Sequence, residues 1–308
     1  MRFISKPAGL LLVLRFTQAA TAQIVIKPGA PKPGKQKAIS SSEISQTLTL
    51  AGQELKTGQK RTSVIQRIAS PPAADGSITI IETVDSLADE TTLPGGVTLK
   101  FDSKEGPKPQ GTAVDFLIDV MAVMSKSQTT LVYDKNGKFT SAKTTAEGLE
   151  ELEEPGKSLL KADLDPQVIQ DRINSENDEY NQNAVKPGDI WNQKTTTDLG
   201  QGAKFSHTST NKYIGMEEQD GVNLHKVTVG YSNVTFKQDA PTPGAPSIAS
   251  TAMEVVDSGT TYYFDAAKQQ VVNRVFHLHV KGDIKLTIQG MEIPAKIEIS
   301  ISTKSKFE

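Results

Sequence analysis

The sequence predicts an α+β protein that is mainly β, with a long, curved, half-barrel-like antiparallel sheet packed on a few helices. Three observations predict this fold. Stretches of alternating apolar and polar residues recur in both halves of the chain. Turn residues separate these stretches at hairpin distances. Between them lies one strongly apolar segment without alternation, which is typical of a buried helix.

The strands of the N-terminal half begin after residue 40. Ile44, Leu48 and Leu50 alternate with polar residues, and residues 78–84 and 97–101 are rich in Ile, Val and Thr. β-branched residues favour strands, since they fit a pleated, half-buried surface. These stretches therefore predict successive strands that pair by hairpins.

A helical insertion is expected at about residues 112–177. Thr112 and Asp115 can cap a helix whose residues to about 126 are apolar on most sides. A second helical region, from about 147 to 177, is broken at Pro155-Gly156, and its last piece starts with Asp165 as cap and Pro166 in the first turn. We expect these helices on the concave side of the sheet.

The C-terminal half is again predicted to be β. Strands are expected at residues 190–197, 204–215, 222–230, 271–280, 284–288 and 297–302. In the last of these Ile297, Ile299 and Ile301 alternate with polar residues, which indicates one dry and one wet face.

The N-terminus resembles a secretory signal. Residues 1–22 combine early positive charge, a short apolar run and small residues before a cleavage point between Ala22 and Gln23. Residues 23–39 are rich in Pro, Gly and Lys and predict a linker, and residues 40–308 predict a single domain. The expected location is therefore periplasmic or secreted. The chain has no cysteine, so neither disulfides nor a lipid-anchored cysteine is expected.

Charge and motifs narrow the function classes. A net charge of -2 with mixed signs gives no field for nucleic acid, and beyond the signal no segment approaches membrane-spanning length. No cofactor motif is present, and no metal site is predicted, because His277 and His279 share a strand face without an evident third ligand.

One motif resembles the catalytic loop of aspartic peptidases. Asp257-Ser258-Gly259-Thr260 follows two valines, as such a loop would, but that chemistry needs two carboxylates sharing a proton. The chain has no second Asp-Thr-Gly or Asp-Ser-Gly. We therefore read this motif as a hairpin turn with Gly259 in a left-handed conformation, and a hydrolase using Asp257 as a minor alternative.

Four residues are candidates for ligand binding. Phe116, Met121 and Met124 could line a lipid or hydrophobic pocket under the sheet, since Met adapts to varied shapes. Ordinary core packing is the simpler interpretation of all three. Trp191 is included because it can anchor the strand that follows the turn at Pro187-Gly188.

Several short elements together resemble an uncharacterised family of exported bacterial β-rich proteins. They include Phe101-Asp102-Ser103, Tyr213-Ile214-Gly215, Tyr263-Phe264-Asp265 and, most distinctively, Gly188-Asp189-Ile190-Trp191. The resemblance spans about residues 43–300 and implies a plan similar to that of periplasmic lipoprotein carriers, in which a curved sheet wraps around helices. It implies no assigned activity.

The sequence thus predicts an exported cell-envelope protein that binds or scaffolds an unknown partner, rather than an enzyme. This expectation depends on the lack of a complete catalytic set. The first alternative is a carrier of a lipid or other hydrophobic ligand, and the second is the hydrolase using Asp257.

Overall fold

The computed structural model describes residues 23–200, 203–239, 247–288 and 290–308. The predicted signal, including Ala22, lies outside these residues. The described strands are β1 Ile24–Val25, β2 Gly34–Leu50, β3 Gln53–Ala69, β4 Ile78–Thr92, β5 Thr98–Asp102, β6 Ser127–Tyr133, β7 Phe139–Ala146, β8 Ala184–Val185, β9 Ile190–Gly200, β10 Ala203–Gln219, β11 Val222–Gln238, β12 Ser247–Ala252, β13 Glu254–Asp265, β14 Gln270–Ile288 and β15 Met291–Phe307. The helices are α1 Phe116–Met124, α2 Gly156–Asp163 and α3 Pro166–Asp178.

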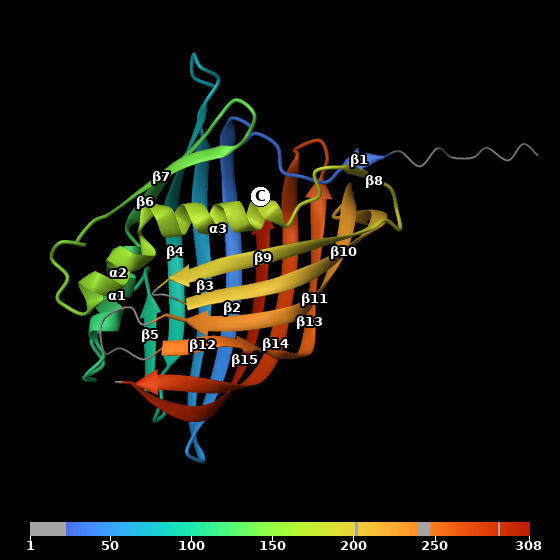
Figure 1. Cartoon of the computed structure of the whole chain (residues 1–308). Coiled ribbons are helices and arrows are strands. Elements are labelled where there is room, and N and C mark those ends of the chain that lie inside the picture. The colour runs from blue at the N-terminus through green and yellow to red at the C-terminus, as the bar shows by residue number, and fades with distance from the viewer. Residues whose placement is uncertain (1–22, 201–202, 240–246, 289) are drawn as a thin grey trace, which may run out of the picture.

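In the described part of the chain, thirteen strands form one antiparallel sheet (Figure 1). Its order is β7-β6-β4-β3-β2-β15-β14-β12-β11-β10-β9, with β5 beside β4 and β13 beside β11 and β14. The two ends, β7 and β9, do not pair with each other, so the sheet stays open. The predicted mainly β protein with one large antiparallel sheet is confirmed.

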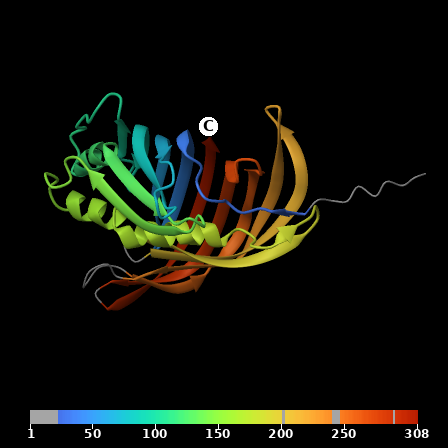
Figure 2. The ribbon, with the colours of Figure 1, turned by 90° about the horizontal axis from the view of Figure 1, so that it is seen from above.

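The sheet is strongly curved. Figure 2 shows α3 and β9 on the same side of β2, β3 and β4, within the curve. Helix α3 contacts both β7 and β9, the two end strands of the sheet. The helix therefore spans the opening that the sheet leaves.

The two faces of the sheet differ as the alternation predicts. We call the inner face the one that carries the buried side chains Leu278, Val280, Ile297 and Ile299. The lysines of β2, β3, β14 and β15 belong to the opposite, outer face, as the registers of these strands show. The inner face is thus the concave, drier one.

Two predicted helical regions are shorter in the structure, and the third is slightly longer. Residues 147–151, predicted to be helical, form a turn, and α2 starts only at Gly156. Helix α1 starts at Phe116, because the Asp115 carboxylate accepts hydrogen bonds from the backbone of residues 110–112 and holds the preceding turn. Its Ile118 and Met121 are buried with Leu87 and Phe101 of the sheet. Helix α3 starts as expected at Pro166, with Asp165 accepting from Gln167 N at 2.7 Å, and extends to Asp178.

Two further predictions differ from the structure. Strand β2 already begins at Gly34, inside the segment 23–39 that the sequence predicts as a linker. The predicted hairpin turn at Asp257-Ser258-Gly259-Thr260 is wrong, because these residues lie inside β13. A Cβ at Gly259 would lie 2.7 Å from Cε1 of His277, so this glycine lets the imidazole pack on the strand backbone.

Candidate functional site

A group of small hydroxyl side chains lies at the centre of the inner face. Ser40, Ser42, Ser63, Thr303 and Ser305, which we call the hydroxyl floor, come from β2, β3 and β15. Pairing places Ser40 opposite both Ser63 and Ser305, and Ser42 opposite Thr303. All five are half-buried, whereas Ile297 and Ile299 farther along β15 are buried. The floor is therefore a part of the inner face that the core does not fill.

The hydroxyl floor continues sideways into a group of large polar side chains. Arg274 of β14 pairs in register with Ser305 on one side and with Tyr262 of β13 on the other. Cross-strand partners on one face have Cβ atoms about 5 Å apart. A single row across five strands therefore joins Tyr262, Arg274 and three serines of the floor.

Helix α3 contributes a carboxylate to this row. Glu179, which follows the helix, accepts a hydrogen bond from Arg274 Nη2 at 2.8 Å, and both side chains are largely buried. Around this ion pair lie four aromatic side chains, and we call the six residues the tyrosine cluster: Tyr180, His207, Tyr231, Tyr262, Glu179 and Arg274. His207 packs edge-on against Tyr231, and Tyr180 against Tyr262, with ring centroids 5.0 and 5.8 Å apart.

Several polar atoms near the cluster are buried without a partner among the described residues. They are Tyr262 Oη, His207 Nε2, Trp191 Nε1 and Thr195 Oγ1. Arg67 Nε, on the same face, lies 2.7 Å from the Glu82 carboxylate but makes no hydrogen bond of good geometry. Tyr231, by contrast, shares a hydrogen bond of 2.8 Å with Thr260 Oγ1. Since buried polar groups in proteins are nearly always hydrogen-bonded, these atoms indicate a place for water or a ligand.

Burial favours the neutral forms of the three tyrosines and of His207 in the cluster. It raises the pKa of Tyr180, Tyr231 and Tyr262 and lowers that of His207. Glu176 of α3 is reached by solvent, yet the surrounding protein desolvates it and raises its pKa against the opposing effect of Arg274. Burial lowers the pKa of Arg274, but Glu179 and the tyrosines outweigh it, and the guanidinium stays charged.

The arginines of the inner face are all paired. On the described strands, Arg61, Arg67 and Arg274 lie on this face, and each meets a carboxylate. Arg61 lies 2.7 Å from Asp89, Arg67 2.7 Å from Glu82, and Arg274 2.8 Å from Glu179. The concave face therefore presents no excess of positive charge at these positions.

A pocket of about 340 Å³ lies at one end of the inner face. The segment of residues 26–36, which we call the strap, borders it together with Arg67, Ile80 and Tyr133. Ile26 is fully buried and anchors the strap to the core.

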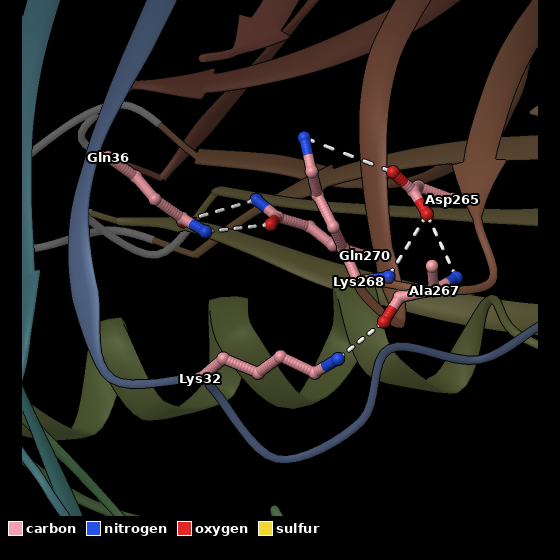
Figure 3. A network of polar contacts seen from close by, with 6 residues as sticks. All are labelled: Lys32, Gln36, Asp265, Ala267, Lys268 and Gln270. Carbon is pink, nitrogen blue, oxygen red and sulfur yellow. Dashed lines mark hydrogen bonds and ion pairs between the residues drawn. The ribbon is translucent and has the colours of Figure 1, made fainter. Parts of the chain in front are cut away.

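Polar contacts join the strap to the turn between β13 and β14 (Figure 3). Lys32 Nζ donates to the carbonyl oxygen of Ala267, and Gln36 exchanges hydrogen bonds of 3.0 and 3.3 Å with Gln270. Asp265 accepts from the backbone N–H groups of Ala267 and Lys268 and so shapes the turn. The strap is therefore fastened to the β13–β14 turn and borders one end of the inner face.

A larger groove, of about 800 Å³, lies on the outer face beneath residues 103–110. Its charged side chains pair with each other, as Lys60 does with Glu43 and Lys100 with Glu90, and they are exposed to water. By volume alone, this groove would be the preferred binding site. We place the candidate site on the concave face instead, because the buried unpaired atoms lie there.

The structure separates the residues that the sequence singled out. Met121 is buried against Leu87 and Phe101, Met124 packs beside this group, and Phe116 faces α2 near Gly156. None of the three lines the pockets described above. Trp191 is half-buried on the inner face of β9, where it packs against the main core. A ligand-binding role for these four residues stays a prediction.

The histidine and aspartate candidates lie on the outer face. His277 is 3.4 Å from the exposed carboxylate of Asp257, and His279 is 2.6 Å from Glu298. No group of three or more metal-ligating side chains occurs among the described residues. These contacts are those of a charged, solvent-facing sheet surface.

The sequence analysis did not find the hydroxyl floor or the tyrosine cluster. A signal for the floor is present, because positions 297, 299 and 301 are Ile while 303 and 305 are Thr and Ser. The signal shows that one strand changes from large to small side chains. It does not show that β2 and β3 change at the same level.

Comparison with known proteins identifies no family. No family model matches the chain, and no curated protein matches it. Nor does any described helix have the length and apolarity needed to span a membrane.

Distant likenesses exist among solved structures. One is lipovitellin, in a structure of its lipid–protein interactions, at 10% identity and a TM-score of 0.41, covering 90% of this chain but only 25% of that one. Another is the COG4313 outer membrane channel from Pseudomonas putida F1, at 8% identity and a TM-score of 0.27, covering 91% and 97% of the two chains. A third is a DUF1329 family protein from Desulfovibrio piger, at 9% identity and a TM-score of 0.12, covering 86% and 83%. At such scores these likenesses support no conclusion about function.

Proposed function

We propose that this protein binds, without catalysis, an amphiphilic ligand on the concave face of its sheet. The observation that carries the proposal is the hydroxyl floor, where five adjacent inner positions bear small, half-buried side chains. Proteins pack their interiors densely, so a patch of small side chains beside a filled core leaves room for another molecule.

The surroundings of the floor suit a molecule with an apolar chain and a polar end. Ile44 and Ile301 lie directly opposite each other on the inner face, and Ala38 lies between Ile65 and Phe307. All five are only partly buried. These side chains can shield an apolar chain from water, while the floor and the tyrosine cluster offer hydrogen bonds.

The location remains a proposal that rests on the sequence. The secretory pattern of residues 1–22 supports an exported binding protein of the cell envelope. The resemblance to the exported family through Gly188-Asp189-Ile190-Trp191 also stays a prediction. Asp257, the residue of the hydrolase alternative, lies exposed on the outer face and away from the proposed site.

Filling the floor tests the proposal. In the double variant Ser40→Leu with Ser63→Leu, two larger side chains occupy the space at the centre of the floor. We expect its affinity for the neutral apolar probe N-phenyl-1-naphthylamine to fall by about tenfold or more, as a loss of a few contacts would give. Fluorescence titration of the purified protein measures this affinity.

The matched control is Ser45→Leu, which places the same side chain on the exposed outer face of β2. This variant should bind the probe as the unchanged protein does, and circular dichroism should show all variants folded. Undiminished binding by a folded double variant would show that the floor is not the binding site.

A further inference from the structure

Two unpartnered atoms of the tyrosine cluster share the same neighbours. Tyr262 is 5% exposed, and its hydroxyl has no hydrogen-bond partner among the described residues, as is also true of His207 Nε2. Tyr231 lies against the His207 ring, with centroids 5.0 Å apart, and its hydroxyl shares a hydrogen bond of 2.8 Å with Thr260, two residues before Tyr262 on β13. The two atoms therefore lie in one polar region around a single ion pair.

This polar region adjoins the hydroxyl floor. Tyr262 is the cross-strand partner of Arg274, which in turn is the partner of Ser305. A ligand lying on the floor would reach the tyrosine cluster within the same row of side chains. The tyrosine hydroxyl can donate a hydrogen bond to a ligand, and the imidazole nitrogen can donate or accept one according to its tautomer.

The charges of the inner face exclude an ionic end on the ligand. Arg274 is already paired with Glu179, and Arg61 and Arg67 are paired with other carboxylates. An anion placed there would remain unpaired or would break a buried ion pair, and either change is costly. A cation would meet Arg274 itself at the centre of the cluster.

We infer that the ligand is an uncharged amphiphile whose hydroxyl or ester oxygens bind Tyr262 and His207, with its chain over the hydroxyl floor. This inference rests on the proposed function and adds the chemical class of the ligand and the two groups that recognise it. A monoacylglycerol has this chemistry: an apolar chain, an ester, free hydroxyls and no charge.

Three compounds with the same chain length test the inference: monolauroylglycerol, laurate at a pH where it is ionised, and dodecane. Each competes with N-phenyl-1-naphthylamine. Monolauroylglycerol and laurate are used below the concentrations at which they form micelles, and dodecane is used below its solubility limit. We expect monolauroylglycerol to displace the probe at about a tenfold lower concentration than laurate. The reason is that the arginines of the inner face are already paired, so the laurate carboxylate would find no partner of opposite charge. Trp191, the only tryptophan of the chain, gives an independent fluorescence signal from the inner face.

The variant Tyr262→Phe removes one hydroxyl and keeps the ring. It should weaken the binding of monolauroylglycerol about 3- to 10-fold, the effect of one hydrogen bond, and leave the binding of dodecane unchanged. Tyr263→Phe is the matched control, because that hydroxyl donates to Glu217 on the outer face at 3.0 Å. This variant should bind both compounds as tightly as the unchanged protein does.

The possible results separate the two proposals. Equal or tighter binding of laurate would overturn the uncharged class, and an unaltered Tyr262→Phe variant would show that water satisfies this hydroxyl. In both cases binding of the neutral probe at the floor would still support the proposed function. If neither the probe nor any of the three compounds binds, the proposed function fails, and the inference fails with it.

Discussion

At the scale of single residues, the concave face is defined by polar groups that the core surrounds but does not satisfy. His207 is an example, since its ring packs on Tyr231 while its Nε2 atom is buried without a protein partner among the described residues. Such a histidine resists protonation, because the charged ring would lose water that the protein does not replace. The free-energy cost of burying this histidine therefore depends on pH, and its effect on stability can be measured.

The pH dependence of stability should therefore carry a contribution from His207. Burial lowers its pKa in the folded protein below the ordinary value of 6.5. Between the two pKa values the unfolded chain binds more protons, so stability is fully present above pH 6.5 and is lost as the pH falls below it. Thermal unfolding from about pH 7.5 to about pH 5.5 should show a smaller fall in Tm for His207→Gln than for the unchanged protein.

The control for this prediction is His277→Gln. That histidine is half exposed on the outer face beside Asp257, so its replacement removes an imidazole from a wet surface and leaves the buried cluster unchanged. Equal pH dependence of the His207→Gln variant and the unchanged protein would contradict the assignment of this contribution to His207.

At the scale of elements, single strands serve two purposes along their length. The inner side of β15 is apolar and buried at Ala295, Ile297 and Ile299, then becomes hydroxylated and half-buried at Thr303 and Ser305. One end of the strand thus builds the core, and the other forms the floor of the site. Helix α3 is similar, as Ile169 and Ile173 pack on a sheet cluster while Glu179 beyond its end joins the tyrosine cluster.

The strap depends on one buried side chain in an otherwise polar attachment. Ile26 is fully buried in the main core, whereas its neighbour Val25 is 46% exposed. Replacing Ile26 by Ala should destabilise the protein by about 2–5 kcal/mol, the usual range for a large aliphatic residue in a core. Urea unfolding measures this loss.

Val25→Ala is the matched control, and its effect should stay within about 0.5 kcal/mol. A small effect of Ile26→Ala, similar to that of the control, would mean that the strap is docked by its polar contacts alone. In that case Gln36→Ala, which removes the contact to Gln270, should be the more destabilising change.

At the scale of the whole molecule, the two ends of the chain meet in the middle of the sheet. Strand β15 pairs along its length with both β2 and β14, so the N-terminal strands and the C-terminal strands form one continuous layer. The main core cluster includes Ile26, and Leu48 and Leu50 of β2 pack against it, whereas β4–β7 contribute to two smaller clusters. This arrangement favours unfolding of the domain as one unit.

Unfolding should therefore be a single transition by two independent signals. Trp191 lies in β9, at one end of the strand order, and reports locally, whereas far-ultraviolet circular dichroism reports on all strands. We expect the two urea midpoints to coincide, as in a cooperative domain. A clearly earlier Trp191 transition would show that β9 and its neighbours unfold separately from β2–β4.

Much of the local structure could be predicted from the sequence. The alternation at 297–302 and the Asp165-Pro166 start of α3 both appear where expected. Each depends on residues only a few positions apart, so backbone preferences and side-chain spacing suffice. The Asp257–Thr260 prediction failed because a glycine that serves cross-strand packing resembles a glycine that serves a turn.

By itself, the sequence determined the element types, the mainly β class and the dry and wet sides of the long strands, since these follow from local periodicity. Only the tertiary structure decided that Ser40 lies between Ser63 and Ser305, and that Arg274 lies between Tyr262 and the floor. Some of these neighbours, such as Ser40 and Ser305, are more than two hundred residues apart in the chain. They meet through strand order and register. Burial and unmet hydrogen bonds arise only after these distant strands pair, because both depend on what surrounds a side chain in space.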